Sequence, residues 1–150
     1  MASLSLRDHF AYLPPPAEVL SILLGTTDLL ISGLAGLTDP HAYLIGYGLK
    51  KSPSAESATS EESTSSLKEQ GLARALASRN LASTAMILAF ALYTRDRKSL
   101  GIAVGISGLV AVADAMVVSV YGVKELMGVH VISAAGRLVL GARLVYWGRS

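Results

Sequence analysis

Residues 100–122, LGIAVGISGLVAVADAMVVSVYG, decide the fold class of this 150-residue chain. An α-helix rises about 1.5 Å per residue, so about 20 apolar residues cross the hydrocarbon core of a bilayer, and this stretch is long enough. It nevertheless carries a carboxylate, Asp114. A charged side chain at such a depth is costly and rare, so Asp114 is a candidate functional residue.

Three other segments resemble this one in length and character, at residues 17–37, 72–94 and 125–147. A run of prolines precedes the first of them, and the last ends at Tyr146 and Trp147, aromatic residues of the kind that gather at a membrane interface. The sequence therefore predicts an all-α fold. We expect one domain over residues 1–150, an integral membrane four-helix bundle with both termini on the same side.

The composition agrees with a membrane protein. Hydrophobic residues make up 51% of the chain and charged residues 16%, compared with about 25% charged residues in a typical soluble domain. The mean hydropathy is +0.48. The chain has no cysteine, which excludes disulfides, thiolate metal sites and thiol redox chemistry. A net charge of +2 is too small to indicate nucleic acid as a partner.

Two segments between the first two spans have a different character. Residues 51–70 are rich in Ser, Thr and Glu, and such a composition buries too little apolar surface to order itself. We therefore expect a flexible loop there. Residues 41–49, HAYLIGYGL, are too short to span a bilayer and are expected at the membrane interface. Lys and Arg are equally frequent on the two expected sides, which leaves the orientation open.

Each expected span also brings polar groups into the apolar zone. Helical spacing places these groups at similar depths, about 8–18 Å from the side that holds the Ser-rich segment, and on the faces that turn toward the bundle interior. We therefore predict one shared site. Its expected catalytic residues are Asp28, Arg79, Asp114 and His130, and its expected substrate-binding residues are Asn80, Ser133 and Arg137.

Two carboxylates bridged by an arginine in a dry pocket suit paired acid–base catalysis. Close carboxylates do not both ionise easily, so one can donate a proton while the other accepts one. Opening an epoxide requires both actions. The Asp–Arg–Asp composition looks like that of limonene-type epoxide hydrolases, which are soluble and differently folded, so this likeness concerns the chemistry alone. The arginines oppose a bound cation, so we expect no metal and no cofactor.

Four short motifs carry a wider resemblance: GLTDP, ASRNL, ADA and GVHVISAAGR, one for each expected span. Together they resemble a domain-of-unknown-function family of small fungal four-helix membrane proteins. Some of its members are assigned as epoxide hydrolases or cyclases in biosynthetic gene clusters, including those for polyene-pyrone polyethers. The resemblance implies an enzyme acting on a lipophilic, epoxidised polyketide or terpenoid. It matches Arg79, Asp114 and His130 to the polar positions of the family. We expect the protein in the endoplasmic reticulum membrane.

Two other classes of function remain open at this stage. A small proton-coupled exporter would use Asp28 as its membrane-embedded acid, although Arg79 and Arg137 would repel cationic drugs. A non-catalytic assembly protein would turn its polar stripes toward lipid-facing seams. For an enzyme, the expected partners are a lipophilic small molecule and membrane lipid, with a homodimer left open. Hydrolysis or cyclisation, and a catalytic or structural role for His130, are also open.

Overall fold

The computed structural model describes residues 14–49 and 60–147, and for residues 60–66 it describes the backbone alone. Within these ranges the chain is helical, without a β-strand, and a single isolated bridge pairs Leu49 with Gly122. Helices over four ranges are long and apolar enough to cross a membrane, namely Pro16–Thr38, Leu67–Thr94, Arg97–Tyr121 and Lys124–Tyr146. The expected helical bundle with four candidate membrane spans is therefore confirmed at this level.

The first span is built from three consecutive pieces. They are α2 (Pro16–Asp28), the π-helical turn η1 (Leu29–Leu34) and α3 (Ala35–Thr38). Pro16 suits the first helical position, where an N–H group would have no partner and where its fixed φ already fits a helix. The wide turn η1 follows Asp28 directly, and π-helical turns inside helices are frequent at functional sites.

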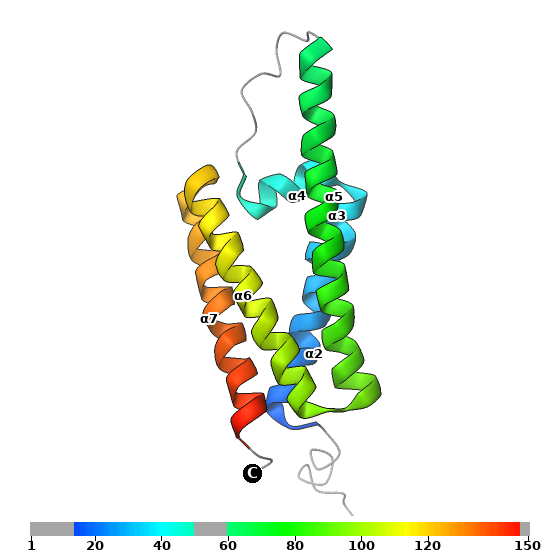
Figure 1. Ribbon diagram of the computed structural model, residues 1–150, viewed down its shortest axis with the longest axis vertical. Helices are drawn as coiled ribbons and strands as arrows, with labels where there is room; N and C mark the ends of the chain where they lie inside the picture. The colour runs from blue at the N-terminus through cyan, green and yellow to red at the C-terminus, as the bar shows by residue number, and fades with distance from the viewer. Residues whose placement is uncertain (1–13, 50–59, 148–150) are drawn as a thin grey trace, which may run out of the picture.

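The short helix α4 (Pro40–Tyr47) follows, and it runs across the long axis of the bundle (Figure 1). Asp39 begins it, because its Oδ1 accepts a hydrogen bond from the N–H of Ala42 at 2.9 Å. Gly48 ends it in the left-handed region, at φ 101°, which a glycine adopts without strain. The expected short segment before the Ser-rich stretch is thus an ordered helix.

The helix that carries the second span begins earlier than expected. It consists of α5 (Ser60–Leu88) and a π-helical turn, η2 (Ala89–Thr94), so residues 60–70 of the expected flexible loop are helical. The remainder of that expectation, residues 51–59, lies outside the described residues. A polar composition excludes a packed core but not a helix. Leu, Lys, Glu and Gln, which occupy positions 67–70, are good helix formers, and a helix already begun extends at low cost.

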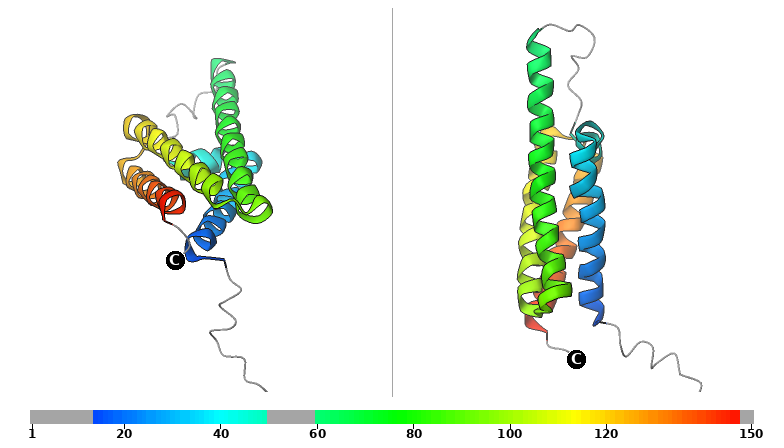
Figure 2. Two further views of the ribbon diagram at one scale, coloured as in Figure 1. Left: turned by 60° about the horizontal axis from the view of Figure 1, so that its bottom comes forward. Right: turned by 90° about the vertical axis from the view of Figure 1, so that its right-hand side faces the viewer.

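The last two spans form an antiparallel hairpin, α6 (Arg97–Tyr121) and α7 (Lys124–Tyr146), which pack along their whole length (Figures 1 and 2). Asp96 caps α6 by accepting hydrogen bonds from the N–H of Lys98 and the hydroxyl of Ser99, and these bonds lower the pKa of Asp96. Glycines allow the close approach of the two helices. A Cβ atom built on Gly141 would lie 2.8 Å from the carbonyl oxygen of Gly101.

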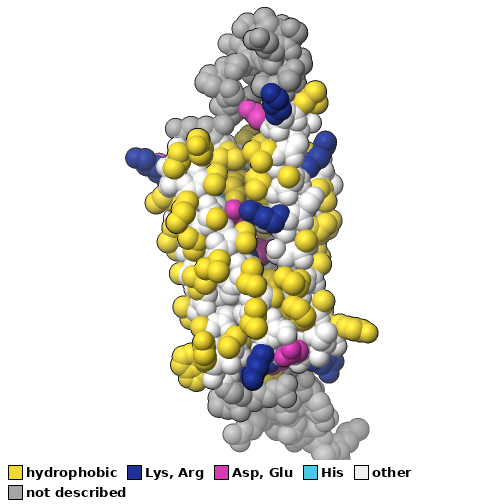
Figure 3. Space-filling model, viewed as in Figure 1, with side chains coloured by type: hydrophobic (Ala, Val, Ile, Leu, Met, Phe, Trp, Pro, Cys, Tyr) yellow, Lys and Arg dark blue, Asp and Glu magenta, His cyan; other side chains and the backbone are white. Residues whose placement is uncertain are grey.

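The beginning of α2 and the end of α7 lie at the same end of the bundle (Figure 2). An apolar core near that end contains Ile87, Leu100, Val104 and Leu144, each at most 1% exposed. Many large apolar side chains instead face outward, which is the pattern of helices that contact lipid. Figure 3 shows apolar side chains over much of one face, with charged groups near its middle and its ends.

Candidate functional site

A small polar cavity lies among α2, η1, α5, α6 and α7. Its volume is about 70 Å³, which leaves room for a few water molecules. The residues that line it come from all four spans and include most of the polar side chains of the bundle interior: Asp28, Ser32, Asn80, Ser83, Thr84, Ile87, Ser107, Val110, Ala111, Asp114 and Arg137. Each span thus contributes a polar side chain to this cavity, whereas Arg79, His130 and Ser133 of the predicted site are not among the residues that line it.

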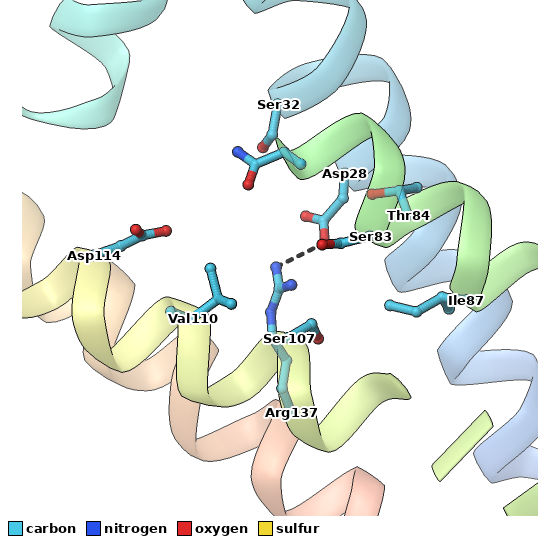
Figure 4. Close-up of a pocket in the computed structure, with 11 residues that line it drawn as sticks. Asp28, Ser32, Ser83, Thr84, Ile87, Ser107, Val110, Asp114 and Arg137 are labelled. Carbon is cyan, nitrogen blue, oxygen red and sulfur yellow. Dashed lines mark ion pairs between the residues drawn. The ribbon is translucent and has the colours of Figure 1, made fainter. Parts of the chain in front are cut away.

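The first ion pair of the cavity joins α2 to α7. Oδ2 of Asp28 lies 2.8 Å from Nη2 of Arg137, and the two side chains are only 17% and 16% exposed. Nε of Arg137 also donates to Oγ of Ser133 at 3.1 Å, which fixes the direction of the guanidinium. Figure 4 shows Asp28 and Arg137 pointing toward each other across the cavity. Ser133 thus orients Arg137, which lies one turn further along α7.

The second ion pair joins α5 to α6. Nη2 of Arg79 donates to both carboxylate oxygens of Asp114, at 2.9 and 3.0 Å. The side chain of Asp114 is 12% exposed and that of Arg79 is 37% exposed. Nε of Arg79 is buried and has no hydrogen-bond partner among the described residues. Asp114 therefore faces the cavity while its arginine lies at the edge of the bundle.

The helical stripes that the sequence predicts explain this placement. Ser21 and Gly25 are buried on the face of α2 that carries Asp28, and Ser32 in η1 continues that face into the cavity wall. Ala111 and Ser107 line the cavity one and two turns before Asp114 on α6. Small side chains along these stripes leave the space that the cavity occupies.

The pairing of the charges differs from the expected arrangement. The sequence led us to expect Arg79 between Asp28 and Asp114. Among the described residues Arg79 pairs with Asp114 alone, while Arg137 pairs with Asp28. Depth and helix face are readable from sequence, but the choice of partner is not. The helix α5 contacts both α2 and α6, so the neighbouring helices alone do not select the partner of Arg79, and in the structure each carboxylate has its own guanidinium.

His130 lies apart from the two aspartates. Its ring does not line the small cavity but a second, larger one under α4, and its Nε2 lies 3.0 Å from the carbonyl oxygen of Tyr47. The rings of Tyr47 and His130 also pack together, with centroids 4.9 Å apart. The single shared site of our expectation is therefore two adjoining cavities, with His130 in the second.

Two tyrosines of α4 complete the surroundings of the site, and sequence reasoning missed both. The side-chain amide of Asn80, which lines the small cavity, donates to the hydroxyl of Tyr43 at 2.9 Å. Burial raises the pKa of Tyr43 and, more strongly, that of Tyr47. Asp114 adds to both of these rises in pKa, so both hydroxyls feel its charge. Their spacing of four residues on a short helix was the available signal.

Comparison with known proteins gives one match. A family model described as a domain of unknown function, DUF4267, matches residues 26–144, a range that contains every predicted site residue. No curated protein and no solved structure matches the chain.

Proposed function

This chain belongs to the DUF4267 family, and we propose that it is a membrane-embedded enzyme that opens epoxides of lipophilic molecules. The observation that carries the proposal is that two carboxylates from different spans, Asp28 and Asp114, line one cavity with room for a few water molecules. Charged groups inside a membrane domain are costly, and where they converge on a cavity they commonly mark a reaction or transport path. Buried ion pairs contribute little net stability, so packing alone is a weak reason to have them.

The proposed reaction joins water to an epoxide. The water oxygen forms a bond to one epoxide carbon, and the bond from that carbon to the ring oxygen breaks. The departing water proton passes to the carboxylate of Asp114, and the ring oxygen takes a proton from a nearby hydroxyl group. Return of the proton from Asp114 to that group through cavity water restores the site, so that the net change is epoxide plus water to diol.

Asp114 is the better candidate for the general base because its charge acts on the hydroxyls of both Tyr43 and Tyr47, which line the larger cavity, whereas Asp28 acts on Tyr43 alone and more weakly. Arg79 holds both oxygens of Asp114 and so fixes the direction of the carboxylate. Asp28, held by Arg137, then orients the attacking water from the opposite wall.

The proposed substrate class rests on the sequence motifs. Their resemblance to membrane proteins assigned as epoxide hydrolases or cyclases supports a lipophilic secondary metabolite, such as an epoxidised polyketide, as the substrate. The endoplasmic reticulum membrane is the proposed location. If a hydroxyl of the substrate replaces water as the nucleophile, the same groups produce a cyclic ether.

The test uses membranes that contain the full chain and isotopically labelled water. Methyl epoxystearate and epoxysqualene serve as probes, and membranes that carry the Asp114→Asn variant serve as the control. Labelled diol formed by the wild-type protein alone supports hydrolysis, and an unlabelled cyclic ether supports attack by an internal hydroxyl. Equal conversion of both probes in wild-type and Asp114→Asn membranes would overturn the proposal.

A further inference from the structure

A second cavity, which we call the α4 chamber, lies between η1, α3, α4 and the first turns of α7. Its volume is about 440 Å³, within the range of about 300–1,000 Å³ that is usual for small-molecule sites. Its walls are mostly apolar, with Ile31, Ala35, Leu126 and Val129 among them. The small polar cavity beside it, at about 70 Å³, is too small for such a molecule.

The α4 chamber and the small cavity share a wall. Ser32 lines both of them. Tyr43 lines the chamber, and its hydroxyl oxygen accepts the hydrogen bond from Asn80, which lines the small cavity. Because the hydroxyl oxygen accepts this bond, its own proton is available to a ligand. The wall between the two spaces therefore presents an oriented O–H donor.

The chemistry of the chamber selects a neutral ligand. Among the described residues that line it there is no Lys or Arg to balance an anion. The carboxylate of Asp39 is engaged as the cap of α4 through Ala42, and Nε2 of His130 is engaged with the carbonyl of Tyr47. A neutral, mainly hydrocarbon molecule is the class that such a space holds best.

We propose that the α4 chamber binds the apolar body of an uncharged lipophilic molecule and that the Tyr43 hydroxyl donates a hydrogen bond to an oxygen of that molecule. The identity of this oxygen as an epoxide rests on the proposed function. The arrangement brings the oxygen to the shared wall, beside Ser32, and hence next to the cavity that Asp114 lines. Tyr43 is then the hydroxyl group from which the ring oxygen takes its proton.

Photoaffinity labelling of the purified full chain tests the chamber. The probe is dodecanol carrying a diazirine, and labelled residues are located by mass spectrometry. Gly46 lines the chamber, and a Cβ atom there would meet no atom within 4 Å, so Gly46→Phe fills space without a clash at Cβ. Gly136 is equally open and does not line the chamber, so Gly136→Phe is the matched control.

We expect the label on α4 and on the first turns of α7. Gly46→Phe should reduce this labelling about tenfold, the effect of about 1.4 kcal/mol of lost binding, while Gly136→Phe leaves it unchanged. The melting temperature of each variant is measured alongside. Labelling spread over lipid-facing residues, or equal labelling of a folded Gly46→Phe variant and wild type, would overturn the inference.

A comparison of two probes, one with and one without a hydroxyl group, tests the hydrogen bond from Tyr43. Tyr43→Phe should weaken labelling by the dodecanol probe by roughly 2- to 12-fold, the range of one neutral hydrogen bond, and leave labelling by a dodecane diazirine unchanged. An equal effect of Tyr43→Phe on labelling by the two probes would contradict the proposed hydrogen bond. If both probes map to the chamber and no epoxide is converted, the chamber stands and the proposed function falls. If diols form while the label lies elsewhere, the proposed function stands and the proposed binding in the α4 chamber falls.

Discussion

Asp28 and Asp114 line one cavity from two different helices, yet each is bound by a different arginine. Arg137 lies 2.8 Å from Asp28, and Arg79 lies 2.9 Å from Asp114. Each negative charge is therefore balanced by its own guanidinium. In the proposed reaction Asp114 is the base, and a different group, the Tyr43 hydroxyl, supplies the proton.

Replacement of Asp114 by Asn tests its role as a base. The amide keeps the volume and hydrogen-bonding capacity but cannot take up a proton. We expect a folded protein whose epoxide conversion falls by roughly 10²-fold or more, the scale of general acid–base catalysis. Glu125→Gln, the same chemical change at an exposed position of α7, should keep full activity. Near-normal turnover by a folded Asp114→Asn variant would end the assignment.

Removal of Arg137 tests the ion pair with Asp28. Arg137→Leu leaves a buried carboxylate without its guanidinium, and we expect a loss of about 3–5 kcal/mol in the free energy of unfolding. The double variant Asp28→Leu/Arg137→Leu should recover most of this stability, because an apolar pair replaces a buried ion pair at little cost. Thermal unfolding in detergent measures both. A double variant less stable than Arg137→Leu would contradict the pairing.

Substitution of a glycine of α7 by alanine should destabilise the α6–α7 contact at Gly141 but not at Gly136. At Gly141 a Cβ atom would lie within 2.9 Å of backbone atoms of Gly101 and Gly105, which cannot move aside separately. Gly141→Ala should therefore cost about 1–3 kcal/mol. Gly136→Ala, in open space on the same helix, should be neutral or stabilising by up to about 1 kcal/mol. Equal melting temperatures of the two variants would show that the hairpin is looser.

The tyrosines of α4 predict a response to high pH. Burial raises the pKa of Tyr43 and Tyr47 above the free value of about 10, so the folded state binds their protons more tightly than the unfolded state. Their contribution to stability is complete below pH about 10 and is lost as the pH rises through the folded pKa values. Tyrosinate absorbance should show a late-titrating fraction that disappears in Tyr43→Phe/Tyr47→Phe. An unchanged titration curve in that double variant would contradict this.

Single thiols test the topology, because the natural chain has no cysteine. Lys98→Cys places a thiol in the first turn of α6, and Glu125→Cys places one in the first turn of α7, at the opposite end of the hairpin (Figure 1). In sealed vesicles a membrane-impermeant maleimide should label just one of the two variants from outside, and both after detergent is added. Labelling of both variants in intact vesicles would contradict four spans.

The fold was largely readable from the sequence because membrane spans obey a length rule and the polar stripes follow helical spacing. Ser107, Ala111 and Asp114 lie on one face of α6 as expected. The partner of each aspartate was not readable, since helix order around a bundle depends on packing between segments. The extension of α5 to Ser60 was missed because the polar composition of residues 51–70 predicts that they are exposed but does not predict whether they are helical.

Tyr43 and Tyr47 were missed for a different reason. Tyrosine in a short segment near a membrane is usually an interfacial residue, and that is how residues 41–49 were interpreted. Only the return of α4 over the end of the bundle brings these hydroxyls near the charges of Arg79 and Asp114. Asp39 and Gly48 begin and end α4, so they determine its length. The local sequence does not predict in which direction α4 runs relative to the bundle.

The two ion pairs also specify how the two halves of the protein recognise each other. Each pair runs from the half made of α2 and α5 to the hairpin of α6 and α7. If the hairpin entered with its helices exchanged, Asp28 would face Asp114 and Arg79 would face Arg137, and like charges in apolar surroundings repel strongly. In the native arrangement each of these two contacts therefore joins an aspartate to an arginine and carries no net charge. We therefore expect two fragments separated between η2 and α6 to assemble in a single orientation.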